Sequence, residues 1–252
     1  DPKWVAKTFP DYFETFFSVV QPDPVHIPVI CIDGPTASGK GTLSQRVAQS
    51  LGYHWLDSGA LYRLVGLKAQ EMGIDTHVDT LQSPHIRLQL GELARQLKVR
   101  FEGDAVWLDG RDVSAQLRTE AAGMAASRVS TVPEVREGLL QCQHAFAQLP
   151  GLVADGRDMG TAIFPNAPLK VFLTATAEKR AQRRHKQLIE KGIDAKIDGL
   201  LADLRERDAR DQSRSASPLK PAEDAHHLDN SDLSIEASVQ QVLSWWRATG
   251  PV

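Results

Sequence analysis

IPVICIDGPTASGKGTLSQRVAQSLG, residues 27–52, joins a short apolar run to a glycine-rich turn and then to a helical pattern. The pattern predicts a buried strand over 29–33 and a helix over 39–51. Gly34 to Lys40 fits the first seven positions of the phosphate-binding pattern G-x-x-x-x-G-K-[ST]. A plain glycine-rich turn without a ligand is the alternative, but the strand, the helix and the lysine all stand where phosphate binding requires them.

Each part of this turn has a physical role. Gly34 and Gly39 permit backbone conformations that aim N–H groups at phosphate oxygens, and the helix beginning near Lys40 adds the positive end of its dipole. Lys40 is expected against the outer phosphates, and a hydroxyl arrives one position late, at Thr42 behind Gly41, where it could bind Mg²⁺. The residues expected to bind ATP here are Gly34, Pro35, Thr36, Ala37, Ser38, Gly39, Lys40, Gly41 and Thr42.

Composition narrows the class of protein. With 252 residues and 42% hydrophobic content, the chain is long enough for one large domain with subdomains. A net charge of −3 gives no sign of general nucleic-acid or membrane binding, and no apolar run approaches the ~20 residues that span a bilayer. Cys31 and Cys142 are expected to be buried and reduced. We therefore expect a cytoplasmic protein that binds small molecules as a monomeric unit.

Strand and helix patterns alternate along much of the chain. Strands are expected over 53–56, 152–154 and 171–173, with a helix over 60–72 after the first of them. Strands connected through helices predict an α/β fold with a parallel sheet covered on both faces. The helix before residue 152 is expected to bury one apolar face, formed by Val135, Leu139, Cys142, Phe146 and Leu149.

Two segments interrupt this alternation. Residues 97–109 predict two antiparallel strands around a turn at 102–104. Residues 177–214 predict two strongly charged helices with a break at 191–194. A final helix is expected over 235–246, with its apolar side packed on the core.

Arginines are placed where a second anion could bind. A phosphate acceptor is already anionic at neutral pH, so its site needs positive charge rather than a general base. Arg63 follows the second expected strand, and Arg157 stands at the carboxyl end of another. Arg207, Asp211 and Arg214 share one helical face. A solvated charged face is the alternative interpretation of that last set.

Four motifs resemble known kinase families. Residues 39–42, Gly-Lys-Gly-Thr, are similar to the phosphate turn of nucleoside monophosphate kinases. Leu-Asp-Ser-Gly-Ala-Leu-Tyr-Arg at 56–63, Ala-Asp-Gly-Arg-Asp-Met-Gly-Thr at 154–161 and Arg-Glu-Arg-Asp-Ala-Arg-Asp at 205–211 resemble bacterial cytidylate kinases over about 28–248. The resemblance implies a P-loop NTPase fold of the nucleoside monophosphate kinase type, with an inserted antiparallel subdomain that binds the monophosphate and a helical lid.

The resemblance also implies which residues hold the acceptor. Ser127, Arg136 and Asp158 would read the cytosine edge, because a carboxylate accepts from the exocyclic amine while arginine and serine donate to the ring. Each of the three also has a plainer interpretation: Ser127 as an ordinary helix residue, Arg136 as a surface partner of Glu137, and Asp158 as a helix cap. The full set implied for the substrate is Ser58, Arg63, Ser127, Arg136, Arg157, Asp158, Arg207, Asp211 and Arg214.

Within that set, Arg63 and Arg157 would contact the monophosphate with Arg214 nearby, and Arg207 and Asp211 would lie at the ribose, close to Ser58. The residues expected to be catalytic are Lys40, Arg157 and Arg214.

A lid over ATP would begin in the first charged helix. Arg180, Arg183 and Arg184 are candidates for the triphosphate, with Arg183 and Arg184 favoured. Lid closure would exclude water, which otherwise competes as the acceptor. Asp33 and Asp155 both end strands beside the phosphate turn, and the sequence does not choose between them as the carboxylate that holds Mg²⁺.

The expected organisation has two parts. Residues 27–252 form the kinase, with a monophosphate subdomain over about 58–130 and a lid over about 178–214. Residues 1–26 are expected to hold the tail of an upstream enzyme and a linker. Residues 1–14 resemble the closing segment of 3-phosphoshikimate 1-carboxyvinyltransferases, in which the lysine matching Lys7 sits in the phosphoenolpyruvate site, although Trp4 departs from the small residue expected there. Because the chain also begins without Met, we expect the kinase part of a bifunctional fusion.

The activity implied is ATP-dependent phosphorylation of CMP and dCMP, in pyrimidine nucleotide metabolism. A kinase for another monophosphate or a small metabolite is one alternative, and a nucleotide-binding switch without transfer chemistry is another. The arginines beyond the phosphate turn argue against a switch, since a switch has no second polyanion to bind.

Overall fold

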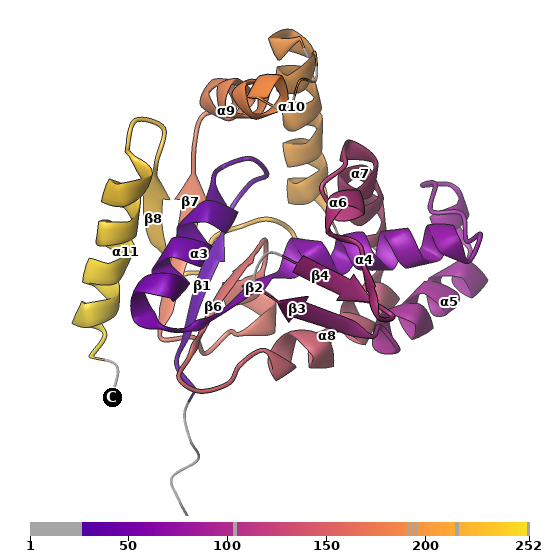
Figure 1. Ribbon diagram of the computed structural model, residues 1–252, viewed down its shortest axis with the longest axis horizontal. Coiled ribbons are helices and arrows are strands. Elements are labelled where there is room, and N and C mark those ends of the chain that lie inside the picture. Colours follow the sequence, from indigo (N-terminus) through magenta and orange to yellow (C-terminus); the bar gives the residue numbers. More distant parts are fainter. Residues whose placement is uncertain are drawn as a thin grey trace, which may run out of the picture.

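The computed structural model describes residues 27–102, 105–190, 192, 194, 196–214 and 217–250. The segment expected to resemble a transferase tail, 1–26, lies outside the described residues. Five parallel strands form the central sheet, in the order β2-β6-β1-β7-β8 (Figure 1). Their bounds are β1 (Val29–Asp33), β2 (His54–Asp57), β6 (Leu152–Gly156), β7 (Leu169–Thr174) and β8 (His226–Asp229).

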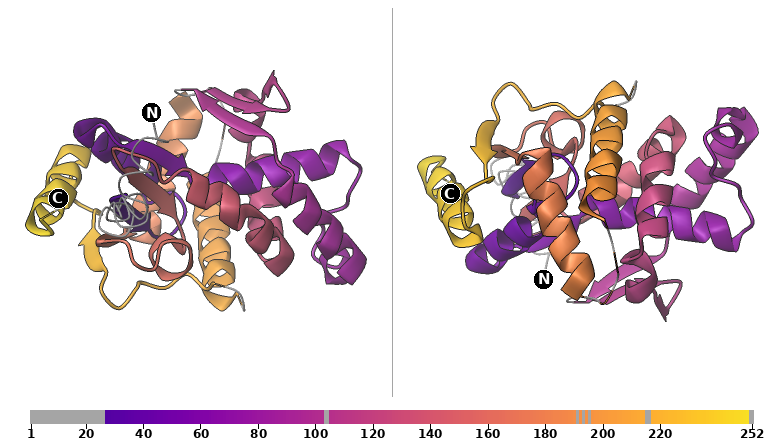
Figure 2. Two further views of the ribbon diagram at one scale, coloured as in Figure 1. Left: turned by 90° about the horizontal axis from the view of Figure 1, so that it is seen from below. Right: turned by 90° about the horizontal axis from the view of Figure 1, so that it is seen from above.

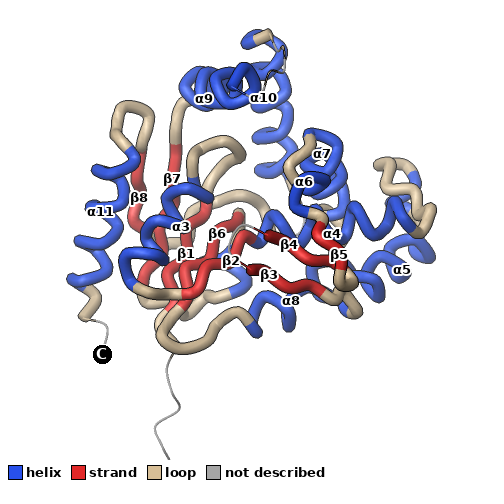
Figure 3. The backbone as a smooth tube through the Cα atoms, viewed as in Figure 1, coloured by secondary structure: helices blue, strands red, loops and turns tan. Residues whose placement is uncertain are grey.

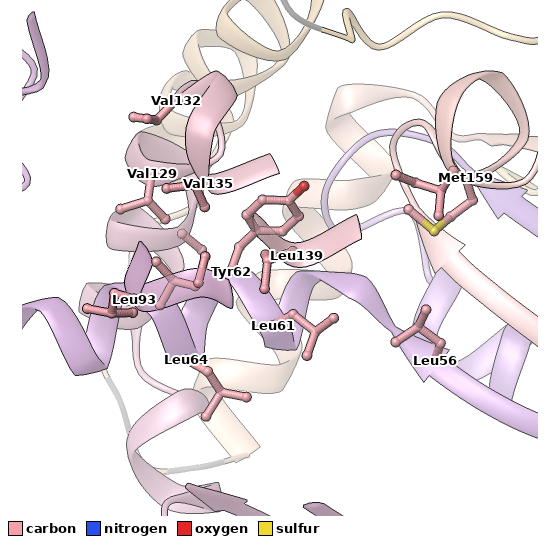
Figure 4. Close-up of a cluster of buried hydrophobic side chains, with 14 of the residues drawn as sticks. Leu56, Leu61, Tyr62, Leu64, Leu93, Val129, Val132, Val135, Leu139 and Met159 are labelled. Carbon is pink, nitrogen blue, oxygen red and sulfur yellow. The ribbon is translucent and has the colours of Figure 1, made fainter. Parts of the chain in front are cut away.

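Alternating side chains of β1 enter two separate apolar cores. Ile30 and Ile32 join the cluster under α3 (Lys40–Leu51) and α11 (Ile235–Ala248), which cover one face of the sheet (Figure 1). Cys31 joins the cluster on the other face, which several further helices build (Figure 4). Those helices are α4 (Ser58–Glu71), α5 (Pro84–Arg95), α7 (Glu120–Val129) and α8 (Pro133–Ala145).

A second, antiparallel sheet has the order β3-β4-β5, and it lies beside α4 and α8, away from α11 (Figure 3). The charged helices α9 and α10 stand together above the carboxyl ends of the central strands (Figures 1 and 2). The bounds of these and the short elements are β3 (Val99–Glu102), β4 (Ala105–Leu108), β5 (Arg111–Asp112), η1 (Thr80–Gln82), α6 (Ser114–Leu117), η2 (Met159–Ile163), α9 (Ala177–Glu190) and α10 (Ile197–Ser213).

The structure confirms the α/β fold and corrects some details. The hairpin at 97–109 is present, but it carries a third strand, β5, that the sequence pattern did not indicate. The apolar face of α8 ends early, because the helix stops at Ala145 and Leu149 is 60% exposed. Cys31 is buried as expected, whereas Cys142 is half-buried, and both thiols are free. No helix within the described residues combines the length and the apolar character needed to cross a membrane.

Candidate active site

The glycine turn at 34–39 connects β1 to α3 and curls around the Lys40 ammonium. Lys40 Nζ donates to the carbonyl of Pro35 at 2.7 Å, and the side chain is buried. Gly34 has φ 152°, and a Cβ there would lie 2.1 Å from the backbone oxygen of Leu173. Gly39 caps α3 with φ 90°, a conformation that residues with side chains rarely adopt. The turn is therefore shaped by its glycines around a central cation, which is the geometry of an anion cradle.

Two buried carboxylates stand beside this cradle. Asp33, at the end of β1, accepts from the backbone N–H groups of Met159 and Gly160, and burial raises its pKa to about 6. Asp155, on β6, is closer to the cradle, since its Oδ2 lies 3.5 Å from the point where a Cβ on Gly41 would stand. Burial raises the pKa of Asp155 to about 7.

The Lys40 ammonium has an unusual protonation equilibrium. Burial, with help from the nearby Arg157, lowers its pKa to about 7, although Asp155 opposes that shift. An anion entering the cradle would replace the lost hydration and favour the charged form. We therefore expect anion binding at this position to be accompanied by proton uptake.

The arginines of the expected acceptor site converge from three elements. Arg157, after β6, donates Nε to Asp211 Oδ2 of α10 at 3.0 Å. Arg207 of α10 is close enough to Arg157 and Arg63 for their charges, together with burial, to lower its pKa to about 10. These guanidinium groups are gathered where the carboxyl ends of the parallel strands meet, instead of spreading over the surface of α10.

The α10 helix face predicted from its spacing is thus turned inward. Arg214 lies 3.5 Å from the Asp211 carboxylate and donates to Ser130 Oγ at 3.3 Å. Burial alone would raise the pKa of Asp211, but Arg157 and Arg214 hold it below its usual range. Arg207 Nε is buried without a hydrogen-bond partner among the described residues, and Arg214 Nη2, also buried, has no partner there beyond its ion pair with Asp211. Orphaned buried donors of this kind fit an anionic ligand.

The three residues implied for base reading also lie together. Arg136 of α8 pairs with Asp158, and both side chains are almost fully buried. The guanidinium of Arg136 lies 5.7 Å from the ring centroid of Tyr62. Ser127 of α7 is buried, and its hydroxyl accepts from Arg210 at 3.2 Å. The plainer interpretation of Arg136 as a partner of Glu137 is wrong, because Asp158 is its partner.

Other expected site residues differ in their burial and in their partners. Ser58 donates its hydroxyl to the backbone oxygen of Asp155 at 2.7 Å. Thr42 is exposed on the first turn of α3. Arg184 of α9 pairs with Glu120 of α7. Arg183 bonds to the turn itself, at the carbonyl of Ser38.

Comparisons with known proteins identify the family of this chain. A family model described as cytidylate kinase matches residues 30–248. The chain belongs to the cytidylate kinase family. A cytidylate kinase from Cupriavidus necator is 55% identical over 224 residues, covering 88% of this chain and 97% of the relative. One from Bordetella bronchiseptica is 57% identical over 221 residues, covering 88% and 96%.

The solved structures that match this chain have lower sequence identity to it than the cytidylate kinases have. TT1252 from Thermus thermophilus has a TM-score of 0.43 at 18% identity and covers 88% of this chain and 97% of its own. Shikimate kinase from Bacteroides thetaiotaomicron has a TM-score of 0.41 at 12% identity, covering 87% and 98%.

The sequence of this cytidylate kinase family member named Arg180 only as a less favoured candidate for the triphosphate, and it missed the supporting residues Asp208, Arg210 and Asn230. Arg180 is buried, donates to the carbonyl of Thr36 at 3.1 Å and pairs with Asp208. Arg210 reaches Ser127, and Asn230 reaches the phosphate turn from the end of β8. The spacing of α10 contained Asp208 and Arg210, but a helical pattern does not say which partner a charged side chain will find. Asn230 stood in a polar run typical of a loop.

Proposed function

We propose that this chain transfers the γ-phosphoryl group of ATP to the phosphate of CMP, giving CDP and ADP, and that dCMP is also accepted. Membership of the cytidylate kinase family supports the acceptor. The single observation that carries the reaction type is the group of half-buried arginines, Arg157, Arg207 and Arg214, of which Arg157 is close to Lys40, because it provides for a second polyanion. A switch protein needs only the cradle.

The chemistry follows from charge and placement. An oxygen of the CMP phosphate attacks the γ-phosphorus, the bond to the β,γ-bridging oxygen breaks, and ADP leaves. No base is required because the attacking oxygen is already ionised. Lys40 and the N–H groups of the turn would neutralise the donor phosphates, while Arg63, Arg157 and Arg214 would hold the acceptor phosphate in line.

We assign the nucleoside contacts in the same way. Asp158 would accept from the exocyclic amine of cytosine, with Arg136 and Ser127 donating to the ring carbonyl and nitrogen. Arg207 and Asp211 would lie at the ribose. Arg210 donates a hydrogen bond to Ser127 Oγ, so the hydroxyl proton of Ser127 is left to be donated to the base.

Mg²⁺ would be held with the triphosphate on the cradle, where it would neutralise charge on the β- and γ-phosphates. Asp155 fits this ion better than Asp33 does, since both oxygens of Asp33 already accept backbone N–H groups. The absence of a side chain at Gly41 leaves the approach beside Asp155 open. Thr42 stays a predicted ligand, although it is exposed.

A panel of acceptors tests the proposal. ADP formation would be followed with ATP and Mg²⁺ in the presence of CMP, dCMP, UMP or AMP. We expect the highest kcat/KM with CMP, dCMP next and UMP lower. AMP ranking above CMP would refute the base-reading assignment, and ATP hydrolysis insensitive to every monophosphate would refute the transfer reaction itself.

The organisation of the chain is part of the proposal. We assign the monophosphate subdomain to about 58–130 and the lid to about 178–214, in a kinase unit that works as a monomer. The free thiols support a reducing compartment, the cytoplasm. From its resemblance to an enolpyruvyl transferase tail, we assign 1–26 to the partner enzyme of a fusion. Mass spectrometry of the native protein from cells would contradict the fusion by finding only a species with the mass of this chain.

A further inference from the structure

The residue after β8 reaches the phosphate turn from a distant part of the sequence. Asn230 is 4% exposed, and its backbone N–H donates to the carbonyl of Thr174 at 3.0 Å. That bond continues the parallel pairing of β7 with β8, in which Thr174 stands opposite Asp229. The backbone of Asn230 is therefore anchored by the central sheet, next to the end of β7.

Asn230 makes polar contacts through both ends of its amide. Its Nδ2 donates to the carbonyl of Ser38 at 2.9 Å, and its Oδ1 accepts from Arg183 Nη1 at 3.0 Å. Arg183 also donates to the backbone oxygen of Asn230 at 2.6 Å and to the carbonyl of Ser38 at 3.2 Å. Since a guanidinium only donates and a carbonyl only accepts, this network permits a single orientation of the amide.

Holding this carbonyl determines where the next N–H group points. In a trans peptide the C=O and N–H bonds face opposite ways, so a Ser38 carbonyl turned outward to Asn230 aims the Gly39 N–H inward. Gly39 has φ 90° and gains no rigidity from a side chain of its own. The geometry of that donor therefore depends on contacts made from outside the turn.

We propose that Asn230 is a positioning residue for phosphoryl transfer: it fixes the Ser38–Gly39 peptide so that the Gly39 N–H faces the donor phosphates, and it ties the lid helix α9 to the turn through Arg183. The proposal rests on the assignment of the glycine turn to the triphosphate of ATP. It goes further, because it assigns a role in ATP binding to a residue outside the turn and outside the lid.

Two substitutions separate the parts of this role. Asn230→Ala removes both ends of the amide without adding charge. Asn230→Asp keeps an oxygen acceptor for Arg183 but places a second oxygen against the carbonyl of Ser38. Ser231→Ala is the matched control in the same loop, since Ser231 Oγ accepts from the Thr176 N–H at 3.0 Å and does not bond to the turn.

Steady-state kinetics of the full chain, with ATP and CMP varied in turn, provide the readout. Both Asn230 variants should raise the KM for ATP about tenfold, consistent with the loss of one buried hydrogen bond to the turn. The KM for CMP should stay within about twofold, and Ser231→Ala should change neither constant. Circular dichroism and thermal melting would establish that each variant is folded, and kcat would be calculated from the concentration of folded enzyme.

The outcomes are distinct. A rise of less than threefold in the KM for ATP in either Asn230 variant overturns the proposal, as does an equal rise in Ser231→Ala or in the KM for CMP. Lys40→Met in parallel tests the underlying assignment. If Lys40→Met is active, the cradle itself is misassigned; if it is inactive while the Asn230 variants behave as the parent, only the positioning role fails.

Discussion

Replacing Asp158 by asparagine should convert a selective enzyme into a less selective one. Asp158 is 2% exposed and pairs through Oδ2 with Arg136, which leaves Oδ1 as the oxygen that we assign to the exocyclic amine of cytosine. Uracil carries a carbonyl at the same place, so the carboxylate would face another acceptor. The substitution Asp158→Asn keeps the shape, removes the charge and supplies an amide that can donate to uracil.

The magnitude follows from two effects of the same sign. A hydrogen bond to a charged group contributes about 1.5–3 kcal/mol, and CMP loses it in the variant, because the single amide oxygen stays on Arg136 and the amide nitrogen faces the base. Removing the carboxylate also relieves the repulsion that excludes UMP. A combined change of about 2 kcal/mol corresponds to a ~30-fold fall in the ratio of kcat/KM values for CMP and UMP.

Stability must be separated from selectivity in this variant. The introduced amide would still offer an acceptor oxygen to Arg136, so we expect a loss of about 1–3 kcal/mol in the free energy of unfolding, less than for truncation of a buried ion pair. The assay should therefore be run well below the melting temperature of the variant, with the folded fraction measured by circular dichroism.

Asp211→Asn is the matched control. Asp211 is also buried, and it too is an arginine partner, bonded to Arg157 at 3.0 Å. Because we assign Asp211 to the ribose, which CMP and UMP share, its substitution should lower kcat/KM for both nucleotides by similar factors. Equal losses for the two nucleotides in Asp158→Asn, or a selectivity change confined to Asp211→Asn, would refute the assignment of the base pocket.

Three further predictions concern the cradle and the scaffold. Lys40→Met should lower kcat by at least ~10²-fold without unfolding the protein, which kinetics and circular dichroism would test, because it removes the central cation. At pH 8 in EDTA, ATP binding should take up protons, because the pKa of Lys40 rises from about 7 when an anion binds, and this uptake should fade below pH 6. Calorimetry in buffers of different ionisation enthalpy measures the number of protons taken up. Proton release would contradict the prediction. Gly138→Ala should destabilise the fold by about 1–3 kcal/mol, because the added Cβ would lie 2.5 Å from the Gly91 carbonyl oxygen. Gly199→Ala is the control: no atom lies within 4 Å of a Cβ added there, so thermal melting should show a neutral or stabilising effect.

Periodicity predicted the strands and helices well where one physical signal dominated. The apolar run of β1, the glycine turn and the helix after it formed as expected, because each element depends on residues adjacent in sequence. The prediction that Leu149 lies on the buried face of α8 was wrong, because the helical spacing of apolar residues continues in the sequence after the helix has ended at Ala145. β5 was missed because two residues, Arg111–Asp112, are too few to show alternation.

The site was predicted less completely, for a different reason. Residue type and position predicted Arg157 and Asp211 as site residues, because arginines at strand ends and on one helical face suit an anion, and the structure pairs the two side chains. Asn230 could not be found that way, because its role comes from the pairing of β8 beside β7, 192 residues away from the carbonyl that it holds. Contacts that depend on sheet order are invisible to local pattern.

The ion pairs of the site also explain why so many carboxylates accompany the arginines. Arg136 faces Asp158, Arg157 and Arg214 face Asp211, and Asp155 offsets part of the charge around the cradle. Cations that lie this close together would repel one another without counter-ions, and an unpaired buried charge costs several kcal/mol. A guanidinium has five N–H donors, so it can keep its carboxylate and still bind a phosphate. The carboxylates therefore hold the arginines in place before the substrates arrive, and phosphate binding need not break the pairs that keep the pocket folded.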